Sequence, residues 1–302
     1  MLSLAHEHYP SRTLREPLLA RRREPVRWSN EPAPDGLPEG AMESYEENGY
    51  FVLPEIFTTS QVRMLQREMQ RLLEEYRGSR DATVIREPGS DAVRSLFDLP
   101  AVSPVFRHLA SHPRLLDFAR HVLASEVYLH QTRLNFKPGL AGKEFFWHSD
   151  FETWHVEDGM PSMRALSCSV LLTDNDEFNG PLLVIPGSHK TYVGCMGETP
   201  KDNYKSSLMS QTVGTPTAES LTLLADQAGG LASIKGPAGT VVFFDCNLLH
   251  GSAGNISPYP RANVFMVYNS MENQLIHPLH GLQPRPGHIA RRSPLKALTP
   301  AQ

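Results

Sequence analysis

The chain has 302 residues, a formal net charge of −4 and a hydrophobic content of 40%. These values are typical of a globular protein and exclude a fibrous or wholly disordered chain. Nothing in this charge indicates a surface that follows the phosphates of nucleic acid, so we expect no nucleic-acid partner.

Residues 1–40 are predicted to form an extended N-terminal arm. Prolines alternate with charged residues from Pro10 to Pro38, which favours an extended segment packed on the surface without a core of its own. The arm contains a basic run, Arg21–Arg23. We expect this run to be a solvated charge cluster.

A single domain is predicted over residues 41–275, beginning with a short strand and helices. Thr58 and Gln61 have the spacing of a capping box, and apolar residues recur at helical period from Val62 to Tyr76. This pattern predicts an amphipathic helix. The other segments expected here are a strand over Gly49–Ile56 and helices over Ala101–Ala110 and Pro113–Leu123.

From Glu126 the pattern changes to the alternation that is typical of strands. In Val127–Lys137 residues two apart share a face, and one face carries Gln131, Arg133, Asn135 and Lys137. Taken alone, this polar face is most simply explained by exposure to solvent. Further strands, separated by turn residues, are expected over Phe145–His148, Arg164–Leu172, Pro181–Ile185, Thr240–Phe244 and Ala262–Tyr268.

Two later segments lack clear periodicity. Residues 191–230 are long and polar, as lids and functional insertions often are. Residues 276–302 form a Pro-rich, basic tail that we expect to lie over the surface. Many short strands after a helical beginning predict a mainly β fold, a sandwich or barrel with helices packed outside it.

His148 and Asp150 are the first candidates for a metal site. On a strand, two residues this far apart point to the same face, where an imidazole and a carboxylate can share one metal. Non-haem iron(II) is commonly bound by two His and one carboxylate, which leaves positions open for dioxygen and substrates. A His-x-Asp pair is common by chance in a chain with 13 His, so the third ligand decides.

His250 is the candidate third ligand. It follows the apolar strand Thr240–Phe244, and Arg261 stands at the start of the next one. A hairpin between these strands would bring Ser252 and Arg261 close to the metal. Because arginine offers a planar fork for a carboxylate, this part of the chain supplies both a ligand and an anchor for a keto-diacid cosubstrate.

Three alternatives stay open at this point. His250 could be a core histidine satisfied by its neighbours, and Arg261 could be the partner of a surface salt bridge. A zinc site could instead use His148, Asp150 and His155, although the spacing from 148 to 155 crosses the faces of a strand.

The same residues resemble the phytanoyl-CoA dioxygenase superfamily. The resemblance lies in the His-x-Asp pair, in the segment 179–189 (NGPLLVIPGSH), and in His250 followed by Arg261. The segment 145–159 (FFWHSDFETWHVEDG) is more specific and resembles the ectoine hydroxylases. The likeness extends from about Gly49 to Gln274.

This resemblance implies a double-stranded β-helix (jelly-roll, cupin-like) core surrounded by helices. It also implies a dioxygenase that uses Fe(II), 2-oxoglutarate and O2 to convert ectoine to 5-hydroxyectoine, releasing succinate and CO2. The polar face of Val127–Lys137 is then expected to line the cavity. By family match, the iron ligands are His148, Asp150 and His250, the 2-oxoglutarate positions are Lys137, Ser252 and Arg261, and the ectoine positions are Gln131, Trp154, Phe244 and Phe265.

Two other functions remain open. A related dioxygenase could hydroxylate another small amino acid such as proline, against which residues 145–159 argue. A jelly-roll protein could also hold a small ligand without turnover, which an intact ligand set with Arg261 disfavours.

The cysteines bear on the compartment. Cys168, Cys195 and Cys246 are odd in number and lack C-x-x-C spacing, so free thiols and a reducing compartment are expected. The first 24 residues contain no apolar core of signal-peptide length, and no run is long enough to cross a membrane. We therefore expect a cytoplasmic protein with no membrane partner, and a homodimer stands as a hypothesis.

Overall fold

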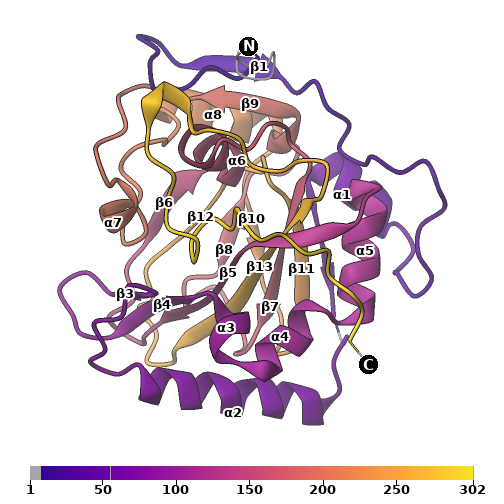
Figure 1. Ribbon diagram of the computed structural model, residues 1–302, viewed down its shortest axis with the longest axis vertical. Coiled ribbons are helices and arrows are strands. Elements are labelled where there is room, and N and C mark those ends of the chain that lie inside the picture. The colour runs from indigo at the N-terminus through magenta and orange to yellow at the C-terminus, as the bar shows by residue number, and fades with distance from the viewer. Residues whose placement is uncertain (1–7, 55, 302) are drawn as a thin grey trace.

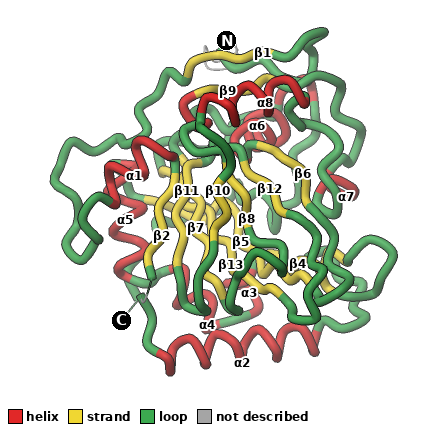
Figure 2. Tube along the Cα trace, turned by 180° about the vertical axis from the view of Figure 1, so that it is seen from behind, coloured by secondary structure: helices red, strands yellow, loops and turns green. Residues whose placement is uncertain are grey.

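The computed structural model describes residues 8–54 and 56–301, and shows two facing β-sheets with helices around them (Figures 1 and 2). Residues 1–7 of the predicted arm, Glu55 of the predicted strand Gly49–Ile56, and Gln302 lie outside the described residues.

The larger sheet has seven antiparallel strands in the order β2–β11–β7–β13–β5–β4–β3. Strand β13 lies between β5 and β7 and is buried along its whole length, because both faces of the sheet are covered. In sheet order the strands are Tyr50–Leu53, Val241–Asp245, Ala165–Leu171, Arg261–Ser270, Val127–Lys137, Val93–Phe97 and Val84–Arg86.

A smaller sheet of four strands, in the order β10–β8–β12–β6, faces the larger one (Figure 2). Between the layers, Leu182 and Val184 of the smaller sheet pack with Phe244 and Phe265 of the larger. This arrangement is the predicted jelly roll. The smaller sheet comprises Ala232–Ile234, Leu182–Val184, His250–Ser252 and Phe145–His148, and a separate pair is formed by β1 (Leu18–Arg21) and β9 (Thr191–Gly194).

Helices cover the outer face of the larger sheet (Figure 1). The capping box predicted at Thr58 and Gln61 is present and begins α2. The single helix predicted over 101–110 is two helices, because Ser103 caps a new helix that has Pro104 in its first turn. The helices of this layer are α1 (Ala41–Asn48), α2 (Thr59–Glu75), α3 (Leu99–Val102), α4 (Pro104–Ala110) and α5 (Pro113–Leu123).

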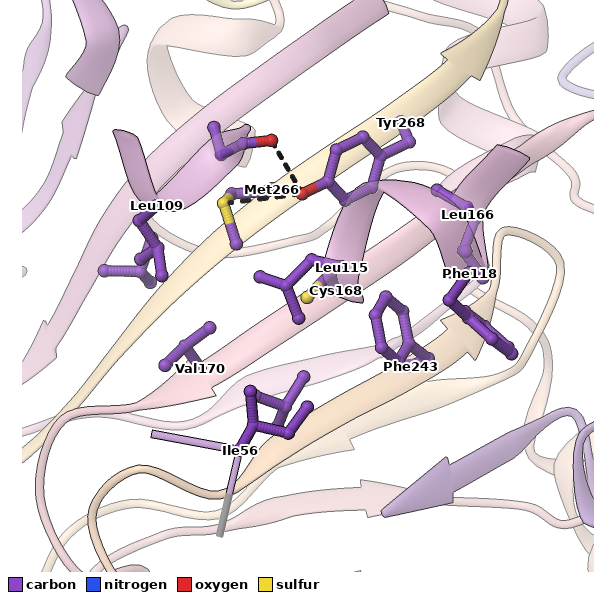
Figure 3. Close-up of a cluster of buried hydrophobic side chains, with 14 of the residues drawn as sticks. Ile56, Leu109, Leu115, Phe118, Leu166, Cys168, Val170, Phe243, Met266 and Tyr268 are labelled. Carbon is purple, nitrogen blue, oxygen red and sulfur yellow. Dashed lines mark hydrogen bonds between the residues drawn. The ribbon is translucent and has the colours of Figure 1, made fainter. Parts of the chain in front are cut away.

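The main hydrophobic core lies between these helices and the larger sheet (Figure 3). On β7, Cys168 and Val170 point into this core, and by alternation Ser167 points to the space between the sheets. Even the buried hydroxyl of Tyr268 is satisfied, since it donates to the carbonyl of Ala110 at 3.0 Å. The alternation along β7 therefore separates a dry packing face from a polar interior face.

The strand predictions hold within one or two residues for most of the chain. The predicted ranges of β5 and β6 agree with the structure. Strand β2 ends at Leu53 rather than near Ile56, because Pro54 has no N–H to donate to the sheet.

The predicted hairpin between β11 and β13 is wrong. Strand β7 lies between them in the larger sheet, and β12 belongs to the smaller sheet. The strand that follows β11 in sequence therefore crosses to the other layer, as in a jelly roll.

The N-terminal segment is not confined to the surface. Tyr9, Arg12 and Arg22 are all buried, and Arg22 forms an ion pair with Asp245 at 2.7 Å. The prediction of a wholly solvated basic run is therefore wrong for Arg22. The division of the chain at residues 40 and 275 stays a prediction.

The segment 191–230 is more regular than predicted. It contains β9, α7 (Tyr204–Ser207) and α8 (Ala218–Gln227), and Thr217 caps α8 by accepting a hydrogen bond from the N–H of Ser220. The C-terminal tail crosses the front of the molecule in Figure 1 and buries Ile289 and Ala290.

The structure also bears on membrane-spanning helices and on the state of the cysteines. Within residues 8–54 and 56–301, no helix is both long and apolar enough to cross a membrane. The cysteines Cys168, Cys195 and Cys246 are buried, and each is a free thiol.

Candidate active site

Three side chains converge where the smaller sheet meets the helical turn α6 (Asp150–Thr153). His148 ends β6 and lies opposite His250 of β12 in the sheet register. The Oδ1 atom of Asp150 lies 3.7 Å from Nε2 of His148 and 3.9 Å from Nε2 of His250. Among the residues that the structure describes, these three are the one group of three or more His, Cys, Asp or Glu residues that could hold a metal ion.

The backbone orients both imidazoles in the same way. Nδ1 of His148 donates to the carbonyl of Phe146 at 2.8 Å, and Nδ1 of His250 donates to the carbonyl of Leu248 at 2.9 Å. In each case Nε2, the lone-pair nitrogen, then faces Asp150. Burial, with His250 close by, lowers the pKa of His148 to about 3, so its ring is neutral and ready to bind a metal.

Asp150 reaches the site by a different route from the one predicted. Strand β6 stops at His148, and Ser149 caps α6 by accepting from the N–H of Glu152, so Asp150 is helical. Its second oxygen, Oδ2, accepts from Ser167 of β7 at 3.2 Å. Two imidazoles and one carboxylate on one side of the site are the ligands that non-haem iron(II) prefers, so the residues fit that metal.

The alternative zinc site does not form. His155 lies in a π-helical turn, Trp154–Asp158, that continues from α6. Its Nδ1 lies 2.7 Å from the carbonyl of Met160 and its ring stacks on Phe151. His250, not His155, completes the group with His148 and Asp150.

A cavity runs between the two sheets, and His148 and His250 line it. Its wall carries four basic side chains, and no carboxylate of the described chain lines it. The residues that matter for its chemistry are Arg94, Arg133, Asn135, Lys137, Ser252, Arg261 and Phe265.

Three of the four basic side chains form no ion pair. Arg94 forms an ion pair with Glu87 at 2.7 Å, whereas Arg133, Lys137 and Arg261 form none with any described carboxylate. All three are held close to the cavity by their strands, β5 and β13. A buried guanidinium without an ion pair costs on the order of several kcal/mol, and burial lowers the pKa of Lys137 so that a bound anion would favour its charged form. The cavity is therefore suited to an anionic ligand.

Lys137 and Arg261 meet Ser252 at one end of this cavity. Nζ of Lys137 donates to Oγ of Ser252 at 2.9 Å, and Nη2 of Arg261 donates to Oδ1 of Asn135 at 2.8 Å. Burial lowers the pKa of Lys137 to about 6 and that of Arg261 to about 10. Lys137 is opposite Arg261 in the sheet register, so the facing of two sheets, not a hairpin, brings the three residues together.

The predicted substrate residues are not all in this cavity. Phe265 lines it, and the ring of Phe244 lies 5.2 Å from that of His250. The amide of Gln131 instead donates to the carbonyl of Ile289 at 2.8 Å. Trp154 packs in a cluster behind α6, with its ring 5.1 Å from that of His130.

Arg133, which had no role assigned from the sequence, lines the cavity. Its guanidinium lies over the ring of Phe265, 5.0 Å from the centroid. Its place on the face expected to line the cavity was predicted, because Arg133 and Lys137 are an even number of residues apart along β5; only its role was not.

A family model and several known proteins match the sequence of this chain. A model of the phytanoyl-CoA dioxygenase family (PhyH) matches residues 45–263. The ectoine dioxygenase of Bordetella bronchiseptica is 54% identical over 300 residues, which cover 99% of this chain and 97% of that protein. The ectoine dioxygenase of Sphingopyxis alaskensis is 50% identical over 293 residues, 96% of this chain and 94% of that protein.

A solved structure shares the whole architecture. The crystal structure of EctD from S. alaskensis with 2-oxoglutarate and 5-hydroxyectoine has a TM-score of 0.87 and 46% identity, and the match covers 97% of each chain. Together with the intact His148–Asp150–His250 group, these matches show that the chain belongs to the phytanoyl-CoA dioxygenase family and, within it, to the ectoine dioxygenases.

Proposed function

We propose that this chain is an Fe(II)- and 2-oxoglutarate-dependent dioxygenase that hydroxylates ectoine to 5-hydroxyectoine and releases succinate and CO2. The observation that carries the proposal is the pairing of two features. Through His148 and His250, the candidate metal group borders a cavity whose buried Arg133, Lys137 and Arg261 form no ion pair with a described carboxylate. A dianionic keto acid provides carboxylates for these side chains next to the metal.

Each ligand has a defined task in this proposal. His148, Asp150 and His250 hold Fe(II), and the hydrogen bonds to the carbonyls of Phe146 and Leu248 keep the two imidazoles in place. Fe(II) held there would supply the chemistry that activates O2. O2 would then be the oxidant, taking two electrons from 2-oxoglutarate, which becomes succinate and CO2, and two from the C–H bond of ectoine that becomes C–OH.

The far end of the cavity binds the cosubstrate. Arg261 receives the distal carboxylate of 2-oxoglutarate through its planar guanidinium, with Ser252 and Lys137 beside it. The anion then gives Arg261 an ion-pair partner and favours the protonated form of Lys137, which favours binding of a dicarboxylate over a neutral molecule.

Ectoine is a zwitterion with a carboxylate and a delocalised amidinium. Arg133 is the cavity cation that remains for the carboxylate, and Phe265 offers an aromatic face, a contact worth about 0.5–2 kcal/mol for a cation. The family resemblance also assigns contacts to Gln131, Trp154 and Phe244. Phe244 lies beside His250, whereas Gln131 and Trp154 lie outside the cavity. These roles are part of the proposal.

Competition between two substrates tests the assignment. Purified protein with Fe(II), 2-oxoglutarate and O2 is given equal amounts of ectoine and free proline, and both hydroxylated products are quantified. We expect 5-hydroxyectoine to predominate. Preferential hydroxylation of proline would assign the chain to a different substrate.

The non-catalytic alternative predicts a different result. Under anaerobic conditions, Fe(II) and 2-oxoglutarate should give a weak visible charge-transfer band with this protein, and His250→Ala should lose it. Ectoine binding that is independent of iron, with no such band, would favour a binding protein.

We also propose that the protein is cytoplasmic and forms a homodimer. Buried free thiols at Cys168, Cys195 and Cys246 are compatible with the reducing cytoplasm. A homodimer remains the proposed assembly, and light scattering of the purified protein tests it.

A further inference from the structure

The N-terminal segment contributes a buried arginine to the neighbourhood of the metal ligands. Arg12 is 1% exposed, and its φ of 58° is a left-handed conformation that side chains other than glycine rarely adopt. Its backbone N–H donates to the carbonyl of Cys195 at 2.7 Å. The chain therefore holds Arg12 in an unfavourable backbone conformation that points its side chain into the protein.

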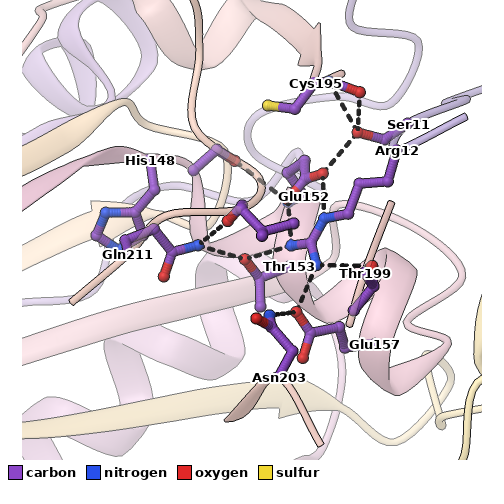
Figure 4. Close-up of polar contacts among 12 residues, drawn as sticks. Ser11, Arg12, His148, Glu152, Thr153, Glu157, Cys195, Thr199, Asn203 and Gln211 are labelled. Carbon is purple, nitrogen blue, oxygen red and sulfur yellow. Dashed lines mark hydrogen bonds and ion pairs between the residues drawn. The ribbon is translucent and has the colours of Figure 1, made fainter. Parts of the chain in front are cut away.

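The guanidinium of Arg12 lies between two buried carboxylates (Figure 4). Nε and Nη2 form a bidentate pair with Glu152 at 2.9 and 2.8 Å, and Nη1 donates to Glu157. Both glutamates are almost wholly buried. Two buried carboxylates that share one arginine require it, since removing the cation would leave them uncompensated.

These two glutamates flank the turn that carries a metal ligand. Glu152 lies in α6, two residues after Asp150, and Glu157 lies in the π-helical turn that follows. A helix of one turn has little stability of its own. By bonding to both segments, Arg12 fixes the π-helical turn relative to α6, and with it the backbone on which Asp150 stands.

The same side chain also holds the segment that follows β9. Nη1 donates to Oγ1 of Thr199 at 3.1 Å, and the amide of Asn203 donates to Glu157 at 2.8 Å. Nη2 donates to Thr153, which accepts in turn from Gln211 (Figure 4). This segment contributes Leu208 to the cavity wall. Arg12 thus links the ligand-bearing turn to one border of the cavity.

We propose that Arg12 is a positioning residue of the active site, which acts through Glu152 and Glu157 to hold Asp150 in place as a metal ligand. Arg12 itself lines no part of the cavity in the described chain, so it acts on the metal through the backbone of α6. The expected effect on hydroxylation rests on the proposed function, whereas the expected effect on metal binding does not.

The test variant is Arg12→Met combined with Glu152→Gln. Wild-type Arg12, Glu152 and Glu157 carry one net negative charge together, and the double variant keeps the same net charge. Only Glu157 then loses its ion pair, and it retains the hydrogen bond from the amide of Asn203. Arg12→Lys retains the cation but not the bidentate fork. The matched control is Arg22→Met, which removes another buried arginine of the same segment that contacts Asp245 and not the ligand-bearing turn.

Co(II) is the metal probe, because its visible absorption reports binding without oxidation. We expect the double variant to bind Co(II) about 10–100-fold more weakly, the range found when partners of metal ligands are lost. Arg12→Lys should show a smaller loss and Arg22→Met wild-type affinity. In turnover, the double variant should make less 5-hydroxyectoine per succinate, with an unchanged 2-oxoglutarate requirement.

Two results would overturn the inference. One is wild-type Co(II) affinity in a double variant that circular dichroism shows to be folded. The other is an equal loss of affinity in Arg22→Met, which would assign the effect to general destabilisation. If the wild type does not hydroxylate ectoine, the proposed function fails, while the Co(II) comparison still decides the role of Arg12.

Discussion

Replacing Arg261 with methionine should separate stability from cosubstrate binding. Arg261 is 2% exposed, its Nε has no hydrogen-bond partner, and no described carboxylate pairs with it. Its pKa, lowered to about 10 by burial and the nearby Arg94 and Arg133, still leaves it charged at neutral pH. Arg261→Met removes this unpaired charge and keeps an unbranched side chain in place of the aliphatic part of arginine.

The expected loss of binding follows from the contact that the proposal gives to Arg261. Truncating one partner of a buried, hydrogen-bonded charge pair costs about 2–5 kcal/mol. Because Lys137 and Ser252 remain beside the carboxylate, we expect the lower part of that range. A loss of about 2–3 kcal/mol corresponds to about a 30- to 140-fold higher 2-oxoglutarate requirement, at 1.4 kcal/mol for each factor of ten.

The assay is succinate release against 2-oxoglutarate concentration at saturating ectoine, with thermal unfolding of the free protein measured in parallel. Arg261→Met should unfold at the same or a higher temperature, since its charge has no partner in the free protein. Arg94→Met is the matched control and should lower the unfolding temperature, because it strands the buried carboxylate of Glu87.

Two outcomes would refute this reasoning. An unchanged 2-oxoglutarate requirement in Arg261→Met would move the anchor to Lys137. A marked fall in the unfolding temperature of the same variant would show that the free protein already compensates the charge.

Three further predictions concern the remaining site residues. His148→Ala, Asp150→Ala and His250→Ala should each abolish turnover and retain the fold by circular dichroism. Activity in any one variant would show that the replaced residue is not a metal ligand. Because burial lowers the pKa of Lys137 to about 6 and a bound carboxylate raises it again, 2-oxoglutarate binding above pH 6 should take up a proton and weaken as pH rises. Calorimetry in buffers of different ionisation enthalpy checks this uptake, and Lys137→Met should eliminate it; pH-independent affinity in the wild type contradicts it. Arg133→Met should raise the KM for ectoine more than that for 2-oxoglutarate, and the reverse order would assign Arg133 to the cosubstrate.

Local sequence patterns predicted the elements whose signals are themselves local. The capping box at Thr58 and Gln61 marked the start of α2, because both partners lie within one turn. Strand β5 was predicted with its observed bounds, since alternation continues up to Lys137 and Pro138 then ends it. The polar face of β5 is also the interior face, as the resemblance implied.

The sequence could not predict which strands become neighbours. Ser252 and Arg261 were expected beside the metal for the wrong reason, a hairpin between β11 and β13. The two residues belong to different sheets, and the contact of Lys137 with Ser252 crosses between those sheets. Such contacts depend on the order of strands in space, which periodicity along the chain does not encode.

Arg12 shows the same limit for a single side chain. It stands among prolines and charges that favour an exposed arm, and its carboxylate partners are 140 and 145 residues away in the sequence. No spacing rule connects positions so far apart. For Gln131 and Trp154, the family resemblance predicted contact with the substrate. In the structure, Gln131 bonds to Ile289 of the C-terminal tail, and Trp154 packs in a hydrophobic cluster with Phe151 of α6.

The most direct test of the central claim is product stoichiometry. The purified protein is incubated with Fe(II), 2-oxoglutarate and ectoine under air and under nitrogen, and both 5-hydroxyectoine and succinate are quantified by NMR. We predict equal amounts of the two products under air, neither under nitrogen, and neither with Asp150→Ala. Unchanged ectoine, with succinate formed at a rate that ignores its presence, would contradict the account.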